Sequence, residues 1–253
     1  MSEEKIVSHA KVGIIGGGIM GVSLLYHLAK EGWKDLVLLE KGELTSGSTW
    51  HAAGQCPQMM GSYNLAKIHR ESNNLYKKLE KETEQPTGFH ECGSLRIAYK
   101  QEDLDWFKYV KGILDNIGAP SEIISTNEIR KVHPFIKLDG ILGAFHTPDD
   151  GHTDPTSTTN AMAKGARNFG AKIYRKNRVT DIRQLTSGEW KLITEKGDIV
   201  CEHVVNAAGS YGPEVGAMVG LKNIPSINMI HHYLVTDEHP SITKLEKELP
   251  VVR

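Results

Sequence analysis

The first residue whose type and setting could support chemistry is His51, in the run Ser48-Thr-Trp-His-Ala-Ala-Gly54. Small residues surround this imidazole, and the run closely follows a pattern that is typical of dinucleotide-binding proteins. A histidine in such a loop can reach the flavin ring of a bound cofactor. The alternative interpretation is a loop histidine whose ring nitrogens are satisfied by neighbouring groups.

A second candidate is the pair His231 and Tyr233, at the start of an apolar run that predicts a strand over 233–236. Residues two apart on a strand point to the same face, so these two side chains would share a face and His232 would point away. Either group could accept a proton from a substrate. The alternative is structural, since a buried tyrosine hydroxyl often only finds a hydrogen-bond partner. The pair alone leaves both interpretations open.

A third group, Asp150, His152 and Asp154, has a spacing that a metal ion could use. Asp149-Asp-Gly151 is, however, a typical turn. Asp154 is a good helix N-cap and is followed by a proline at the first helical position. These roles account for both aspartates, so we expect no metal site.

The elements that must position His51 form a strand–helix–strand unit. Lys11–Ile15 is a short apolar strand, and Gly16-Gly-Gly-Ile-Met-Gly21 leads into a helix that continues through Lys30. Leu36–Leu39 is the second strand and ends at Glu40.

Each conspicuous residue of this unit has a physical role. Gly16 allows the tight turn, Gly18 lets the backbone approach a pyrophosphate, and Gly21 lets helix and strand pack closely. The helix N-terminus then faces the phosphates. Glu40 lies nineteen residues after Gly21, close to the spacing of roughly 20 for the acid that binds a ribose hydroxyl. The pattern predicts nucleotide binding, the alternative being a glycine-rich turn in an ordinary α/β core.

The following segment favours FAD over NAD. Residues 42–56 are rich in Gly, Ser, Thr and Ala and show no periodicity, so they can lie along an extended ligand. The next strand with a binding signature comes only at His203-Val-Val-Asn-Ala-Ala-Gly209. This delay suits a flavoprotein domain with insertions better than a simple dehydrogenase domain.

Composition excludes several classes of protein. The chain has 253 residues, a formal net charge of −1 and 39 % hydrophobic residues, which allows a sizeable core but creates no field for nucleic acid or acidic lipid. Three widely spaced cysteines indicate neither a disulfide framework nor a zinc site. Because the acidic N-terminus runs almost directly into the first strand, we expect no targeting peptide. No apolar run approaches the roughly 18 residues of a membrane span. We expect a cytoplasmic protein without a membrane or nucleic-acid partner.

Farther along, 61–83 reads as a helix with Leu65, Ile68, Leu75 and Leu79 on its core side, and 242–248 as a short late helix. The fold class is α/β, with a Rossmann-like FAD-binding domain interleaved with an incomplete α+β substrate domain. We assign 1–83 and 148–222 to the first domain, and 84–147 and 223–253 to the second. The last residues resemble the beginning of a strand, so we expect a truncated chain that is poorly active alone.

Several of these motifs together resemble the dimethylglycine dehydrogenase and sarcosine dehydrogenase group of the D-amino-acid-oxidase-like flavoproteins. Beyond the glycine motif and Glu40, the resemblance rests on five segments: Glu43–Gly54, Gly88–Arg96, Asp150–Pro155, Asn206–Gly209 and His231–Thr236. The segment Gly88–Arg96 looks closer to the dimethylglycine branch. The resemblance implies a FAD domain of the glutathione-reductase type.

The resemblance also implies that His51 carries FAD through a covalent bond to the 8α-methyl carbon of the flavin. Together with the glycine motif, it predicts these cofactor-binding residues: Gly16, Gly18, Ile19, Met20, Gly21, Glu40, Lys41, Gly47, Ser48, Thr49, Trp50, His51, Ala52, Ala53, Gly54, Gln55, Val179, Gly209 and Tyr211. The position of His231–Thr236 in the resemblance leads us to predict that His231 and Tyr233 are catalytic. Members of the group usually continue into a tetrahydrofolate-binding domain.

The implied reaction is hydride transfer from an N-methyl carbon to flavin N5, in one-carbon metabolism. It would release formaldehyde or pass the one-carbon unit to folate. The substrate would be a small N-methylated amino acid, dimethylglycine or sarcosine, and the electron acceptor an electron-transfer flavoprotein or oxygen. Two alternatives stay open: another FAD-dependent amine or amino-acid oxidase, and a non-catalytic truncated paralogue.

Overall fold

The computed structural model describes residues 5–253, which separate into two compact units. Unit 1 contains the chain up to Ala52, Leu79–Thr87 and Pro155–His231. Unit 2 contains Ala53–Lys78, Gly88–Asp154 and His232–Arg253. The sequence-based domains divide the chain differently at 53–78 and 148–154, which belong to unit 2, and at 84–87 and 223–231, which belong to unit 1. The functional domain boundaries therefore stay a prediction.

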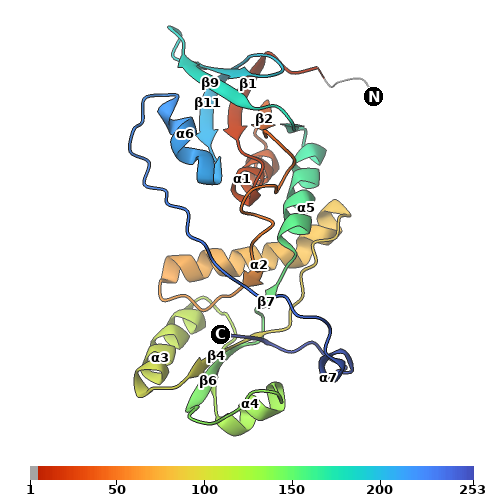
Figure 1. The fold of residues 1–253 in the computed structure, drawn as a ribbon, viewed down its shortest axis with the longest axis vertical. Helices are drawn as coiled ribbons and strands as arrows, with labels where there is room; N and C mark the ends of the chain where they lie inside the picture. The colour runs from red at the N-terminus through yellow and green to blue at the C-terminus, as the bar shows by residue number, and fades with distance from the viewer. Residues whose placement is uncertain (1–4) are drawn as a thin grey trace. The chain divides into compact units, whose positions relative to one another are not determined.

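Unit 1 is built on a six-stranded sheet in the order β8-β2-β1-β11-β10-β9. Figure 1 labels β2, β1, β11 and β9 of this sheet. The strands are β8 (Lys172–Tyr174), β2 (Leu36–Leu39), β1 (His9–Ile15), β11 (Ile199–Asn206), β10 (Trp190–Thr194) and β9 (Val179–Gln184). The first four strands pair in parallel, and β11, β10 and β9 form an antiparallel meander. The expected Rossmann-like arrangement is confirmed.

Helices α1 (Ile19–Lys30) and α5 (Pro155–Asn168) pack together in this unit, and α1 also contacts β1 and β2. The short helices η1 (Gly209–Tyr211) and α6 (Gly212–Ala217) follow β11. All four residues of β2 are buried, as expected for a parallel strand whose two faces are both covered.

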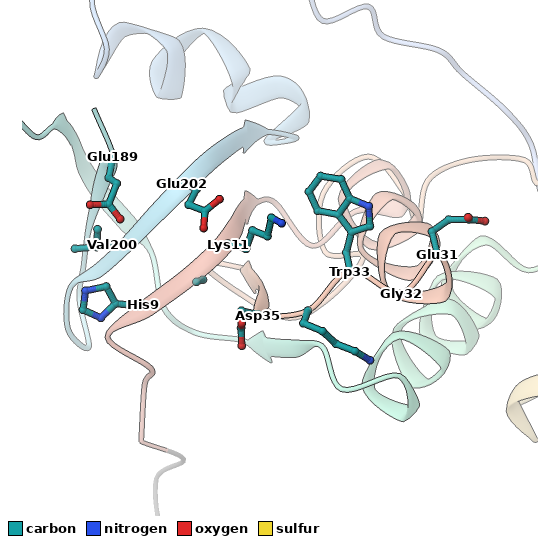
Figure 2. A pocket seen from close by; sticks show the side chains of 11 residues that line it. His9, Lys11, Glu31, Gly32, Trp33, Asp35, Glu189, Val200 and Glu202 are labelled. Atoms are coloured by element: carbon teal, nitrogen blue, oxygen red, sulfur yellow. The ribbon is translucent and has the colours of Figure 1, made fainter. Parts of the chain in front are cut away.

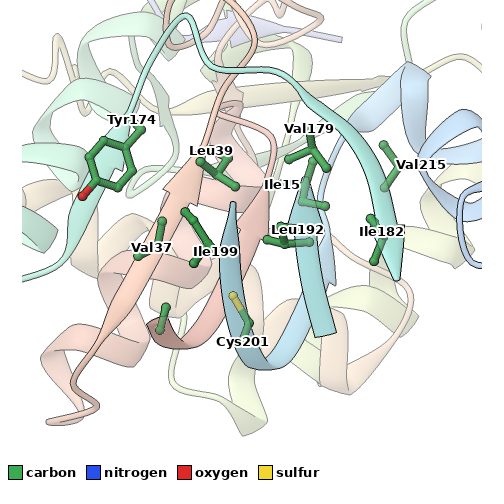
Figure 3. Close-up of a cluster of buried hydrophobic side chains, with 11 residues drawn as sticks. Ile15, Val37, Leu39, Tyr174, Val179, Ile182, Leu192, Ile199, Cys201 and Val215 are labelled. Atoms are coloured by element: carbon green, nitrogen blue, oxygen red, sulfur yellow. The ribbon is translucent and has the colours of Figure 1, made fainter. Parts of the chain in front are cut away.

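An apolar core combines side chains of the parallel strands, of the meander strands and of α6. Figure 3 shows Ile15, Val37 and Leu39 beside side chains of β9, β10 and α6, including Ile182, Leu192 and Val215. Neighbouring residues such as Ile14 and Leu38 are fully buried on the other face, because side chains alternate along a strand. Both faces of the central strands are therefore buried.

Unit 2 contains a four-stranded sheet in the order β12-β4-β6-β5 and a two-stranded sheet of β3 and β7. The strands are β12 (Val251–Val252), β4 (Ser94–Ala98), β6 (Gly143–Thr147), β5 (Glu122–Ile124), β3 (Gln55–Cys56) and β7 (Gly151–His152). The helices are α2 (Tyr63–Thr83), whose last five residues belong to unit 1, α3 (Gln101–Asn116), α4 (Thr126–Val132) and α7 (Pro240–Thr243).

Two apolar clusters stabilise unit 2. Phe107, Val110 and Leu114 of α3 pack with Phe145 of β6, and Ile129 of α4 packs in a second cluster with residues of β4, β5 and β6. Helix α4 begins with a capping box, in which Ser125 and Glu128 exchange hydrogen bonds. Among the described residues, no helix has the length and apolarity needed to span a bilayer.

Three local expectations are wrong. Residues 233–236 are irregular instead of forming a strand, and the late helix is α7, which covers Pro240–Thr243 instead of 242–248. Leu65 and Ile68 of α2 are 50 % and 61 % exposed, so they are not core residues. The apolar run at 233–236 has no partner strand among the described residues, and a strand needs a neighbour to satisfy its backbone groups.

Two helical glycines test the packing. An added Cβ at Gly165 of α5 would lie 2.7 Å from the ring of Tyr26, which is 1 % exposed, whereas Gly112 of α3 has open space around it. We expect Gly165→Ala to lower the free energy of unfolding by about 1–3 kcal/mol, because a buried ring must shift. We expect Gly112→Ala to raise it by up to about 1 kcal/mol through helix propensity. Urea unfolding followed by circular dichroism measures both, and equal effects would contradict the packing.

Candidate functional site

The turn between β1 and α1 admits no side chains. Gly16 has φ +118°, and an added Cβ would lie 2.3 Å from the carbonyl oxygen of Ala207. At Gly21, an added Cβ would lie 2.0 Å from the carbonyl oxygen of Gly16. The register aligns Ile15 with Leu39 and with Asn206. The turn therefore lies at the carboxyl edge of the parallel strands, where α/β sheets bind ligands.

The N-terminus of α1 opens toward this edge. Gly18 is its N-cap and brings no side chain, and the first turn contains no acidic residue. The Ile19 N–H donates to Oγ1 of Thr49 at 3.0 Å, and Met20 is 75 % exposed. An anion can therefore approach the positive end of the helix dipole.

Glu40, the predicted ribose ligand, is buried directly after β2. Its Oε2 accepts the N–H of Gly17 at 2.6 Å, and its Oε1 accepts the N–H of Gly42 at 2.7 Å. Each carboxylate oxygen retains a further acceptor position, which a ribose hydroxyl could use. Glu40 therefore also shapes the glycine turn, which the sequence did not reveal.

The loop that follows is anchored at its base and exposed at its tip. The N–H of Thr45 donates to the Gly17 carbonyl at 3.0 Å. Oγ1 of Thr49 accepts the N–H of Ile19. Trp50 and His51 are exposed, with their ring centroids 3.7 Å apart. The other predicted loop residues Gly47, Ser48 and Ala52 are also exposed.

Four predicted cofactor residues meet in one small cavity. Gly16, Lys41, Val179 and Tyr211 line it, together with apolar side chains of β1, β2 and α6. The Nζ of Lys41 lies 3.0 Å from the centroid of the Tyr211 ring. Gly209, the first residue of η1, is exposed and has φ +56°. This cavity joins segments that are far apart in the sequence.

The remaining predicted loop residues, Ala53, Gly54 and Gln55, belong to unit 2. The Gly54 carbonyl accepts the N–H of Thr153 at 2.9 Å, and Oε1 of Gln55 accepts the Nε–H of Arg253 at 2.7 Å. The structure therefore divides the predicted cofactor loop between the two compact units.

The candidate catalytic pair lies in an irregular segment. His231 is exposed, and Tyr233 is 61 % exposed. The shared strand face that motivated their pairing is therefore absent, and their catalytic roles stay a prediction.

Asp150 is a residue whose importance the sequence reasoning missed. It is fully buried, with Oδ2 accepting the hydroxyl of Ser94 at 2.6 Å and Oδ1 accepting the backbone N–H of Gln58 at 2.9 Å. Burial raises the pKa of Asp150, although these hydrogen bonds oppose the shift. Its carboxylate is committed to holding unit 2 together. The sequence Asp149-Asp150-Gly151 is typical of a turn, so no local signal indicates that Asp150 is buried.

A separate hollow lies at the amino-terminal end of β1 and at the end of α1, near the start of β2 (Figure 2). Its lining includes His9, Lys11, Glu31, Trp33 and Glu202. It is at the opposite end of β1 from Gly16, so it has no part in the candidate cofactor site.

Comparison with known proteins agrees with this geometry. The family model described as FAD dependent oxidoreductase, DAO, matches residues 11–252. The chain is 45 % identical to mitochondrial dimethylglycine dehydrogenase of Rattus norvegicus over 96 % of its length, and 35 % identical to mitochondrial sarcosine dehydrogenase of Homo sapiens over 94 %. It is also 36 % identical, over 97 %, to the mitochondrial pyruvate dehydrogenase phosphatase regulatory subunit of Mus musculus.

These relatives are much longer proteins. The chain spans 28 %, 26 % and 28 % of their respective lengths. Among solved structures, L-proline dehydrogenase from P. horikoshii matches with a TM-score of 0.78 and 28 % identity, over 87 % of this chain and 58 % of that one. The sequence-based recognition and fold class are confirmed.

Glu40 can be tested without any ligand. We expect Glu40→Gln to lower the free energy of unfolding of the flavin-free protein by about 1–3 kcal/mol, because an amide NH₂ would replace one of two acceptors and leave a backbone N–H unpaired. Urea titration of the variant, with the exposed Glu31→Gln as control, measures this loss. Equal stability of the two variants would show that Glu40 does not hold the turn.

Proposed function

The chain belongs to the FAD-dependent oxidoreductase family, and on this premise we propose that it forms the FAD-binding part of an enzyme that oxidatively demethylates dimethylglycine or sarcosine. The observation that carries this proposal is the 45 % identity to a dimethylglycine dehydrogenase over 96 % of the chain. Family membership itself supports FAD as the cofactor.

The residues present fit this cofactor. The side-chain-free turn at Gly16, Gly18 and Gly21 leaves the backbone and the α1 N-terminus open to a pyrophosphate. Glu40 would accept a ribose hydroxyl beside the two amides that it already binds. The cavity that contains Lys41 would hold another part of the nucleotide. His51, exposed at the tip of an anchored loop, is the proposed site of covalent attachment.

Bound FAD would supply the redox chemistry, by accepting a hydride from the N-methyl carbon of the substrate. The chain must then orient a small amino acid and favour its neutral amine, because the nitrogen lone pair assists hydride loss. His231 and Tyr233 are the proposed acceptors of the amine proton. The oxidised substrate reacts with water to give formaldehyde and the demethylated amine, or passes its one-carbon unit to folate.

The relatives leave a second candidate function. The identity to the regulatory subunit of a phosphatase favours a non-catalytic paralogue that uses the same fold to bind a partner. A colourless purified protein would support this alternative. Another amine or amino-acid oxidase is distinguished by a substrate panel and by whether oxygen reoxidises the reduced protein. The electron acceptor and the cytoplasmic location stay predictions.

Covalent attachment at His51 has a direct test. We expect acid-precipitated holoprotein to remain yellow and its His51 peptide to carry the mass of the flavin. His51→Ala should release all flavin on denaturation, while His203→Ala, at an exposed position on β11, should retain it. Complete release from the unchanged protein would disprove the covalent link but would leave tight noncovalent FAD possible.

Substrate and proton acceptors can be tested together by anaerobic stopped-flow spectroscopy of the holoprotein. We expect dimethylglycine to bleach the oxidised flavin, sarcosine to act more slowly, and glycine, which has no N-methyl carbon, to be inert. Tyr233→Phe and His231→Ala should slow flavin reduction by roughly 10²-fold or more, the usual scale of general acid–base help. His232→Ala serves as the neighbouring control. Normal reduction in both variants would remove these residues from the chemistry.

A further inference from the structure

Three side chains that the proposed reaction does not use converge in unit 2. Nδ1 of His90 lies 2.7 Å from Oε2 of Glu248, and Nε2 of His152 lies 2.5 Å from Oε1 of the same carboxylate. The three groups offer one ligand atom each, and these atoms all lie within 4.8 Å of one another. The residues are 62 and 96 positions apart, so only the fold brings them together.

The two imidazoles are held by the backbone. His90 and His152 form an antiparallel bridge, in which the His90 N–H donates to the His152 carbonyl at 2.8 Å and the reverse bond measures 3.1 Å. Residues paired in this way present their side chains on one face. The rings are indeed stacked, with centroids 5.0 Å apart and planes at 16°.

The bridge has little freedom to move. An added Cβ at Gly151 would lie 1.9 Å from the His90 carbonyl oxygen, so the two segments touch through the backbone. β7, which contains His152, also pairs with β3. Glu248 is tethered three residues before β12, which pairs with β4. Two ligands are thus preorganised, and the third is on a segment anchored nearby.

The three groups that form this hydrogen-bonded cluster could also hold a metal ion. For both rings to donate a hydrogen bond to the Glu248 carboxylate, Nδ1 of His90 and Nε2 of His152 must each carry a hydrogen. A cation placed among the three groups replaces both hydrogens and accepts the same three donor atoms. Two imidazole nitrogens and one carboxylate oxygen form a donor set that zinc accepts, with its fourth position left to water.

We propose that His90, His152 and Glu248 bind a divalent transition-metal ion of the zinc type, which clips the segment before β12 to the His90–His152 bridge. The cluster is partly exposed, with side-chain exposures of 56 %, 32 % and 45 % respectively, so an ion can enter from solvent. None of the three ligands is a predicted cofactor residue, although His152 pairs with Gln55, which is one.

The test uses the whole chain, stripped with a chelator and then freed of the chelator. Zn²⁺ is titrated in competition with a chromophoric chelator, and thermal unfolding is recorded with and without the metal. We expect one Zn²⁺ per chain and a higher unfolding midpoint with zinc, because an ion that binds only the folded state stabilises it. Mg²⁺, which prefers oxygen ligands, should produce neither effect.

Variants separate this site from adventitious binding. His90→Ala, His152→Ala and Glu248→Gln should each weaken Zn²⁺ binding by at least about tenfold and abolish the shift in midpoint. Glu246→Gln, an exposed residue of the same segment, and His203→Ala should change neither. Glu248→Gln is conservative and at the surface, so it keeps the test valid if a histidine variant fails to fold. Absence of saturable binding, or equal binding by Glu248→Gln and the unchanged chain, would overturn the proposal.

Discussion

The constraint on which unit 1 depends is the close approach of backbone to backbone where β1 passes into α1. An added Cβ at Gly16 would lie 2.3 Å from the carbonyl oxygen of Ala207, just after β11, and one at Gly21 would lie 2.0 Å from the carbonyl oxygen of Gly16. Glycine therefore lets the turn pack against the segment after β11 and lets α1 pack against the turn. This contact brings the α1 N-terminus to the carboxyl edge of the sheet. The buried Glu40 carboxylate then holds the turn from the next strand. Removing any of these features would displace the others.

Local rules explain why the sequence predicts this part well. The glycine spacing, the two apolar strands and the following acid are all contained in Lys11–Glu40, and each has a short-range physical reason. The capping box at Ser125 is equally local and forms as the spacing indicates. Consistency between motif and propensity over one short segment makes its structure predictable from the sequence, although Gly16 also packs against the distant Ala207.

The predictions that failed depend on residues distant in the sequence, and so do the features that the sequence could not predict. Periodicity placed Leu65 and Ile68 in the core, but periodicity says only that a helix has an apolar side, and α2 instead buries Ala66 and Asn73. The apolar run at 233–236 is strand-like in composition but has no neighbouring strand in the described chain. The cavity shared by Lys41 and Tyr211, and the buried position of Asp150, likewise arise from segments that meet only in the folded state.

The anchoring of the His51 loop links two proposed roles, phosphate binding at the glycine turn and flavin attachment at His51. Thr45 binds the carbonyl of Gly17, and Thr49 binds the N–H of Ile19. Gly17 and Ile19 border the proposed phosphate-binding turn. The loop base therefore cannot shift without changing the turn, whereas its tip, with Trp50 and His51, remains exposed. A fixed base and an accessible tip are what attachment to an extended ligand requires, because the phosphates set the position of the ligand and the loop sets the reach of the imidazole. The hydrogen bonds of Thr45 and Thr49 would therefore serve both proposed roles.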